Sequence, residues 1–204
     1  MTAALALWLY VLGLALAFGW RTLAQWRATG DTGLRLDAGP ALSISWWAKL
    51  AFVAALLLGA AGPAAALAGL PPVHALDAGW LRTSGIVVAG AGIVATLAAQ
   101  LNMGTSWRIG VDPAEHTALV TSGAFALVRN PIFTAMIATS LGLTAMVPNL
   151  VSLTATATLI ASIQIQVRAV EEPYLLRTHG PAYAAYTARV GRFLPGIGCS
   201  TRAR

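Results

Sequence analysis

The sequence has few charged residues and a single cysteine, and both shortages exclude large classes of protein. Of 204 residues, 10% are charged and 57% are hydrophobic, and the mean hydropathy is +0.71. Soluble domains carry about 25% charged residues, so this chain cannot cover a water-facing surface and lipid is the expected solvent for much of it. One cysteine, Cys199, excludes an internal disulfide framework. Three scattered histidines have no paired ligand spacing, so we expect no metal site.

The basic residues indicate a membrane topology rather than nucleic-acid binding. The net charge is +6, and every lysine and arginine except Arg82 lies in the first connection, the third connection or the C-terminal part. Cytoplasmic connections carry this excess in membrane proteins. We therefore expect the N-terminus outside and the C-terminus in the cytoplasm, with anionic lipid headgroups as the partner of these charges and no nucleic acid.

Uncharged runs long enough to cross a bilayer are abundant. A spanning helix needs about 20 mostly apolar residues. The sequence offers five candidates, which are residues 2–20, 50–73, 83–107, 132–147 and 150–167. Pro148 and Asn149 alone separate the last two, which predicts a tight hairpin of antiparallel helices. The expected fold is all-α: a polytopic membrane protein of about five helices forming one domain over residues 1–204, with a cytoplasmic C-terminal helical segment.

Polar residues gather in two stretches, 102–133 and 168–195, which this topology places on the same side of the membrane. In the first, Thr121-Ser122-Gly123 indicates a turn, and Asn130-Pro131 predicts the start of a helix with Asn130 as its cap. Arg129 beside them is equally consistent with an anchor that reaches the headgroups.

The second polar stretch begins with Arg168, Glu171 and Glu172. A continued helix puts Arg168 one turn from both glutamates. Pro173 disfavours helical geometry at Glu172 and can start a new helix. Two adjacent carboxylates at a membrane boundary need water, a cation or a ligand. A solvated helix start explains the pair equally well.

Three further patterns have structural interpretations. Gly180-Pro181 predicts a break in the helix, and Tyr183 and Tyr186 share one helical face that we expect to be packed. The run of small residues at 90–95 matches a dinucleotide fingerprint formally. It lies inside an apolar span, which favours close helix packing instead.

The two polar stretches together resemble the integral-membrane methyltransferases of the isoprenylcysteine carboxyl methyltransferase and phospholipid methyltransferase group. Residues 119–133, ending in Arg-Asn-Pro-Ile-Phe, are similar to that family's segment ending in Arg-His-Pro-x-Tyr. Residues 171–175 are similar to its Glu-Glu-x-x-Leu, and residues 180–195 to its Gly-x-x-Tyr-x-x-Tyr and Val-x-Arg-Phe-x-Pro ending. The resemblance extends roughly from residue 107 to 195, so residues 102–195 form the methyltransferase-like half, after the three helices of residues 1–101 and before a tail of residues 196–204.

The resemblance implies S-adenosylmethionine as the cofactor, bound at the cytoplasmic end of the last three spans. The cofactor-binding positions that it implies are Leu119, Val120, Phe125, Arg129, Asn130, Pro131, Phe133 and Glu171. Three positions differ from the family pattern, because Asn130 replaces a histidine and Phe125 and Phe133 replace tyrosines. Asn130 still forms hydrogen bonds but carries no proton at neutral pH.

Methyl transfer is an in-line displacement that needs alignment and exclusion of water. A carboxylate acceptor is already nucleophilic, and Arg168 or Arg129 would orient it. An amine acceptor must lose a proton, and Glu172 is the nearest candidate base. We expect Arg168 and Glu172 as the catalytic residues and a lipid-like or prenylated acceptor that enters from the bilayer. The oligomeric state stays open.

Two other classes remain open from the sequence. Membrane sterol and steroid reductases share a similar C-terminal pattern and use NADPH. A non-enzymatic helical scaffold or small transporter is the second alternative, although a transporter places ionisable groups near the midplane. Here the spans hold only neutral polar residues near their inner ends, such as Gln100 and Gln166.

Overall fold

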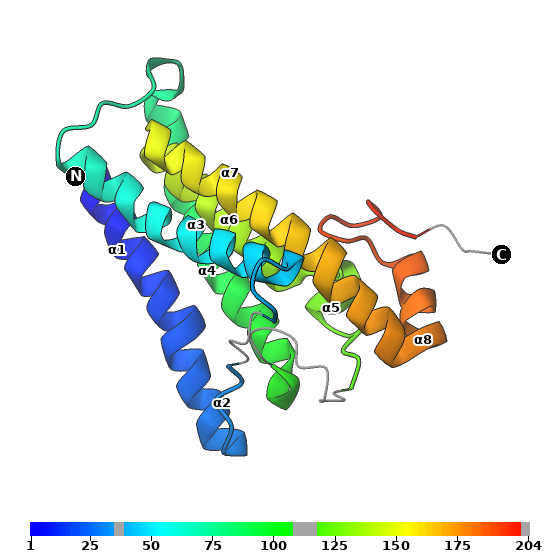
Figure 1. Cartoon of the computed structure of the whole chain (residues 1–204). Helices are drawn as coiled ribbons and strands as arrows, with labels where there is room; N and C mark the ends of the chain where they lie inside the picture. The colour runs from blue at the N-terminus through cyan, green and yellow to red at the C-terminus, as the bar shows by residue number, and fades with distance from the viewer. Residues whose placement is uncertain (35–38, 108–117, 201–204) are drawn as a thin grey trace.

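A computed structural model describes residues 1–34, 39–107 and 118–200, and within these ranges the chain is helical and forms no extended strand. Helix α1 (Thr2–Leu14) continues through the π-helical turn η1 (Ala15–Trp20) into α2 (Arg21–Thr29). The other long helices are α3 (Ile44–Leu67), α4 (Gly79–Asn102), α6 (Pro131–Met146), α7 (Leu150–Ile165) and α8 (Glu172–Arg189). The short elements are η2 (His74–Leu76), η3 (Gly104–Ser106), α5 (Ala124–Leu127) and the π-helical turn η4 (Gln166–Glu171). Figure 1 shows the helices as one bundle, with α8 and the C-terminal segment beyond it.

The expected polytopic all-α fold is confirmed. In the part of the chain that the structure describes, four helices are long and apolar enough to cross a membrane, namely Thr2–Thr29, Ile44–Leu67, Gly79–Asn102 and Leu150–Arg189, and α6 is a shorter apolar helix. The last of the four has 40 residues, about twice what one crossing needs. We therefore expect its polar part, from Gln166 onward, to lie outside the hydrocarbon layer.

Two helices begin earlier than the uncharged runs predict. The second span starts at Ile44 rather than residue 50, because the side chain of Ser43 accepts a hydrogen bond from the Trp46 amide and caps the helix. The third starts at Gly79 rather than residue 83. In both cases a charged residue, Lys49 or Arg82, lies inside the first turns, so a boundary drawn at the charge is too late.

Glycines allow α4 and α6 to pack closely. A Cβ added at Gly85 would lie 2.6 Å from the carbonyl oxygen of Gly142, and one added at Gly92 would lie 2.7 Å from the amide nitrogen of Thr139. A side chain at either position would collide with the backbone of α6. The prediction that small residues in this span serve packing is therefore confirmed for Gly92, whereas Gly90 faces open space.

The predicted hairpin of the last two spans is present, and Asn149 fixes its turn. Asn149 is fully buried, caps α7 by accepting from the Ser152 amide, and donates to the carbonyl of Gly62 in α3. The turn also accepts a hydrogen bond at Pro148 from the amide of Val73, in the segment that joins α3 to α4. These contacts close the end of the bundle that lies opposite the polar stretches.

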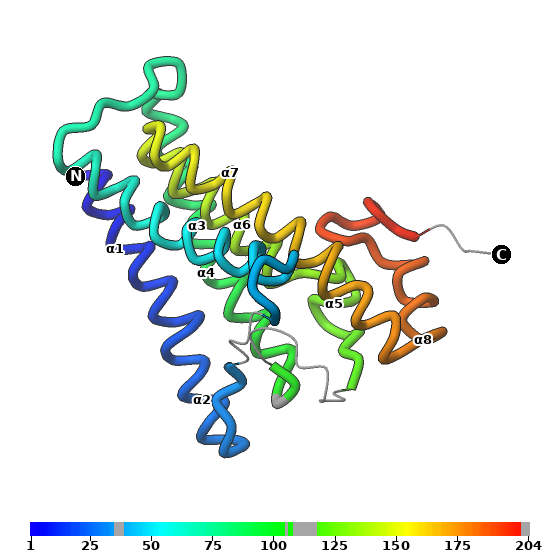
Figure 2. The backbone as a smooth tube through the Cα atoms, in the orientation of Figure 1, coloured from blue at the N-terminus to red at the C-terminus, as the bar shows by residue number. Residues whose placement is uncertain are grey.

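We call the other end the site end. It gathers the end of α4, α5, the beginning of α6, the end of α7 and α8, as the tube in Figure 2 shows. The up-and-down course of α6 and α7 therefore brings residue 130 and residue 166 to the same end, as expected.

Candidate functional site

The beginning of α6 is fastened to the C-terminal segment that follows α8. The amide of Arg129 donates to the carbonyl of Gly191 at 2.8 Å, and the amide of Asn130 donates to that of Arg192 at 3.1 Å. The side-chain amide of Asn130 donates to the same Arg192 carbonyl at 3.1 Å, and the Thr134 hydroxyl donates to the carbonyl of Phe193 at 2.9 Å. Asn130 thus occupies the predicted cap position of α6, but its side chain binds the tail instead of capping the helix.

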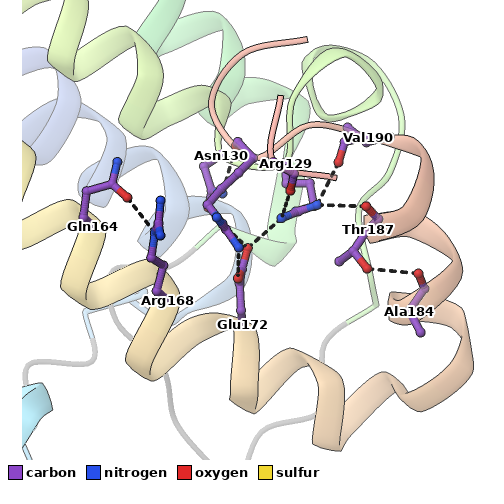
Figure 3. Close-up of polar contacts among 10 residues, drawn as sticks. Arg129, Asn130, Gln164, Arg168, Glu172, Ala184, Thr187 and Val190 are labelled. Carbon is purple, nitrogen blue, oxygen red and sulfur yellow. Dashed lines mark hydrogen bonds and ion pairs between the residues drawn. The ribbon is translucent and has the colours of Figure 1, made fainter. Parts of the chain in front are cut away.

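Three charged side chains form the centre of the site: Arg129, Glu172 and Arg192. Arg129 Nη2 lies 2.8 Å from Glu172 Oε1, while Arg192 binds both carboxylate oxygens, with Nε 2.7 Å from Oε1 and Nη2 2.9 Å from Oε2. Figure 3 shows Glu172 pointing from its helix toward Arg129. Glu172 therefore pairs with two arginines that come from different parts of the chain.

Arg129 also binds three carbonyls, of which one lies in α8 and two in the segment that follows it. Its guanidinium donates to the carbonyls of Thr187 at 3.1 Å, Val190 at 2.8 Å and Gly198 at 3.1 Å, and its side chain is 2% exposed. The interpretation of Arg129 as an anchor reaching the headgroups is wrong, because an anchor needs an exposed end. Instead, Arg129 holds α8 and the tail against the beginning of α6.

The two arginines keep Glu172 ionised. Burial alone would raise the pKa of this carboxyl, but the hydrogen bonds and charges of Arg192 and Arg129 lower the pKa below its ordinary value. The same hydrogen bond raises the pKa of Arg192. A carboxylate held in this way is a weak proton acceptor, which argues against the use of Glu172 as a general base.

Arg168 does not join this cluster. Its side chain is exposed, and its Nε donates to Gln164 Oε1 at 2.8 Å, one turn earlier in α7. Figure 3 shows Arg168 turned toward Gln164 and away from Glu172. Helical spacing puts Arg168 one turn from both glutamates, but the structure pairs Glu172 with Arg129 and Arg192 and Arg168 with Gln164.

The side chain of Glu171 binds Gln166, whereas that of its neighbour Glu172 binds two arginines. Gln166 Nε2 donates to Glu171 Oε1 at 3.2 Å. The two residues are the first and last of η4, and the i→i+5 pattern of a π-turn aligns side chains that a regular α-helix separates. Burial raises the pKa of Glu171 to about 7; the Gln166 hydrogen bond opposes this, and the charge of Glu172 adds to it.

The π-turn also explains why Pro173 does not break the helix. We expected non-helical geometry at Glu172, but its φ and ψ are −60° and −45°, and Pro173 lies in the first turn of α8. A proline has no amide hydrogen and its ring collides with the carbonyl four residues earlier. The wider turn just before it relieves that conflict. The break expected at Gly180-Pro181 is present, because Gly180 has φ 49° and ψ −125°.

The apolar candidates line the same end of the bundle. Phe125 is buried, and its carbonyl accepts a hydrogen bond of 2.6 Å from the hydroxyl of Tyr186, which is buried as expected. Phe133 packs with Phe193 against a cluster that includes Val167. Pro131 is buried at the start of α6, whereas Leu119 and Val120 are half-buried in the segment before α5.

Sequence reasoning did not select Arg192 or Gln166 as site residues. Arg192 had a signal, since it belongs to the Val-x-Arg-Phe-x-Pro ending, but spacing along the chain does not reveal that it returns to Glu172. Gln166 had no signal, because its alignment with Glu171 depends on the π-turn.

An apolar pocket lies inside the bundle, between α1, α3, α4, α6 and α7. Its walls include Tyr10, Phe18, Leu56, Ile93, Met136 and Leu159. Leu159 also belongs to the apolar cluster that contacts Phe133 and Phe193. The pocket is therefore adjacent to the apolar side of the site.

Comparisons with known proteins identify a family and a similar fold. Residues 80–182 match the family described as phospholipid methyltransferase. Among solved structures, the eukaryotic intramembrane Ras methyltransferase ICMT (isoprenylcysteine carboxyl methyltransferase) has a similar fold, with a TM-score of 0.57 and 22% sequence identity, covering 94% of this chain and 67% of that one. At this identity the structural match supports the fold alone. No curated protein matches the sequence.

Proposed function

Because the chain belongs to the phospholipid methyltransferase family of integral-membrane methyltransferases, we propose that it transfers a methyl group from S-adenosylmethionine to a lipid-like acceptor at the membrane boundary. Family membership favours this activity over an NADPH-dependent reductase or a non-enzymatic scaffold. The acceptor enters from the bilayer and the donor from the cytoplasm. The N-terminus lies outside in this proposal, and the site end faces the cytoplasm.

The observation that carries the proposal is that the two glutamates differ in their ion-pair partners. Glu172 is neutralised by two arginines, whereas no cation pairs with the half-buried Glu171 among residues 1–34, 39–107 and 118–200. A buried carboxylate without a countercharge suits a cationic ligand. S-Adenosylmethionine carries positive charge on its sulfonium and on its amino group, so the residues present fit it.

S-Adenosylmethionine supplies an activated methyl group when bound. The chain's own part is alignment and exclusion of water. In this proposal Glu171 binds the polar groups of the donor, and Phe125, Pro131 and Phe133 with Leu119 and Val120 form its apolar walls. Arg129 and Asn130 support these walls by holding the tail over the beginning of α6.

Glu172 takes a revised role in this proposal. We expected it as a base, but its two ion pairs make it a positioning residue that orders the tail. Without a base, an acceptor that is already ionised is preferred, and a carboxylate meets that condition. Arg168, which is exposed at the boundary, is then the residue that orients the carboxylate, and the apolar pocket takes the hydrocarbon part of the acceptor.

A labelling experiment tests the reaction. Purified protein is incubated with lipid extract and methyl-labelled S-adenosylmethionine, and the products are identified by mass spectrometry. We expect a labelled methyl ester of a lipid-like carboxylate. Labelled N-methyl lipids would instead show an amine acceptor, and the absence of any labelled lipid would contradict the proposal.

Titration calorimetry in detergent tests the cofactor assignment. We expect Glu171→Ala to abolish binding of S-adenosylmethionine. Asp77→Ala is the control, because Asp77 pairs with Arg82 near the start of α4, at the opposite end of the bundle. Normal affinity in the Glu171 variant would contradict the assignment.

A further inference from the structure

Three buried polar atoms of the site end lack a hydrogen-bond partner among the described residues, namely Gln100 Oε1, Arg129 Nε and Gln166 Oε1, and the last belongs to the side chain that binds Glu171. Gln166 Oε1 is shielded from solvent and accepts no hydrogen bond from the part of the chain that the structure describes. Its companion atom Nε2 is bound to Glu171 Oε1. Buried amide oxygens normally have a donor, so an unpaired one points to a ligand or an ordered water.

The two side chains together place an unused acceptor, the Gln166 carbonyl oxygen, beside the Glu171 carboxyl. Gln166 presents its carbonyl oxygen, and Glu171 presents a carboxylate with one oxygen already bound by Gln166. The complementary ligand group must therefore donate at least two hydrogen bonds, and a positive charge on it would compensate the carboxylate. An ammonium group, with three donors and a full charge, meets both conditions.

Within residues 1–34, 39–107 and 118–200, no cation is paired with these two side chains. Arg129 and Arg192 are bound to Glu172, and Arg168 is bound to Gln164. Of the groups on S-adenosylmethionine, the sulfonium has no hydrogen to donate, and the exocyclic amine of adenine is uncharged. The amino group of the methionine part is the one that is both charged and rich in donors.

We propose that Gln166 is a further cofactor-binding residue, which the π-turn aligns with Glu171 so that the two side chains together bind the ammonium group of the methyl donor. This inference rests on the proposed function. The side chains at the two ends of η4 meet because the turn is π-helical. The irregular turn thus has a binding role in addition to relieving the strain at the proline.

Calorimetry with two ligands tests the inference. S-Adenosylhomocysteine retains the amino-acid group, whereas 5′-methylthioadenosine has the same nucleoside and thioether without it. We expect Gln166→Leu to weaken S-adenosylhomocysteine about tenfold or more, as for loss of a charge-assisted hydrogen bond. Binding of 5′-methylthioadenosine should stay unchanged. Gln164→Leu, the same substitution two residues earlier, should change neither affinity.

Gln166→Asn is a second variant that keeps the polar amide group but has a shorter side chain, and it tests the inference even if Gln166→Leu fails to fold. We expect the same selective loss, with a thermal midpoint close to that of the parent protein. If the parent binds S-adenosylhomocysteine and both Gln166 variants bind it equally well, the inference is overturned while the proposed function stands. If the parent binds neither ligand, the proposed function itself fails. Equal weakening of both ligands would show that Gln166 shapes the site without contacting the ammonium group, which also overturns the inference.

Discussion

At the scale of single residues, the adjacent Glu172 and Glu171 are expected to contribute differently to the stability of the fold. Glu172 holds two arginines, one of them 2% exposed. Removing one member of a buried ion pair leaves the other charge uncompensated, at a cost of about 3 kcal/mol or more. Glu171 forms no ion pair with any residue that the structure describes. The two positions therefore provide a matched comparison for the same substitution.

We expect Glu172→Gln to lower the free energy of unfolding by about 3 kcal/mol, because Arg129 stays buried with too little negative charge. Glu171→Gln should cause no loss, because it breaks no ion pair seen among the described residues and removes a carboxyl whose ionisation burial opposes. Denaturation of both variants in detergent, followed by circular dichroism, measures the difference. Equal losses would show that the arginine pairs do not stabilise the fold.

The raised pKa of Glu171 predicts a pH dependence of stability. Its pKa is about 7 in the folded chain and 4.5 ordinarily. Between these values the folded state binds more protons than the unfolded state, so stability should fall as the pH rises from 4.5 to 7. Thermal midpoints across this window test the trend, and Glu171→Gln should flatten it. If the thermal midpoints of the parent and of the variant changed equally with pH, Glu171 would not be the group responsible for the trend.

At the scale of helices, the sequence predicted the spans well because hydrocarbon thickness dictates their length. It predicted the break at Gly180 and the hairpin turn at Asn149, since both depend on local chemistry. It did not predict the π-turn or the start of α3 at Ile44. The π-turn accompanies the steric conflict at Pro173, and the start of α3 depends on the cap that Ser43 provides before Lys49. Neither feature changes the hydrophobic pattern of the sequence.

The contact between α4 and α6 gives a prediction at this scale. Gly92→Ala should destabilise the fold by about 1–3 kcal/mol, as for overpacking a tight interface, because the new methyl group meets the backbone of α6 at Thr139. Gly90→Ala, on the same helix, should cause no loss, since no atom lies within 4 Å of its added Cβ. Thermal unfolding in detergent compares the two. A Gly92 variant as stable as the Gly90 variant would show that the helices separate easily.

At the scale of the whole molecule, the ordered motifs indicated that the two polar stretches would meet, and they do so through Asn130, Arg192 and Glu172. The choice of partners was not predictable. Helical spacing places Arg168 beside the glutamates, but the folded tail returns Arg192 to Glu172 and leaves Arg168 with Gln164. That choice depends on tertiary packing, which spacing along one helix does not contain.

The orientation in the membrane can be tested with the single cysteine. Cys199 lies on the tail at the site end. A membrane-impermeant maleimide should label it in inside-out vesicles and leave it unlabelled in right-side-out vesicles. The reverse should hold for Ala75→Cys combined with Cys199→Ser, because Ala75 is exposed in the segment at the opposite end. Labelling of Cys199 from the outside would invert the proposed topology.

The contacts of the last described residues have a practical consequence. We expected the chain after residue 195 to be a tail, yet the carbonyl of Gly198 accepts from buried Arg129 and the amide of Ser200 donates to Thr187. Trimming these residues to aid crystallisation would uncover a buried guanidinium and loosen the packing of α8 against the beginning of α6. An affinity tag belongs at the other terminus, where Met1 is fully exposed.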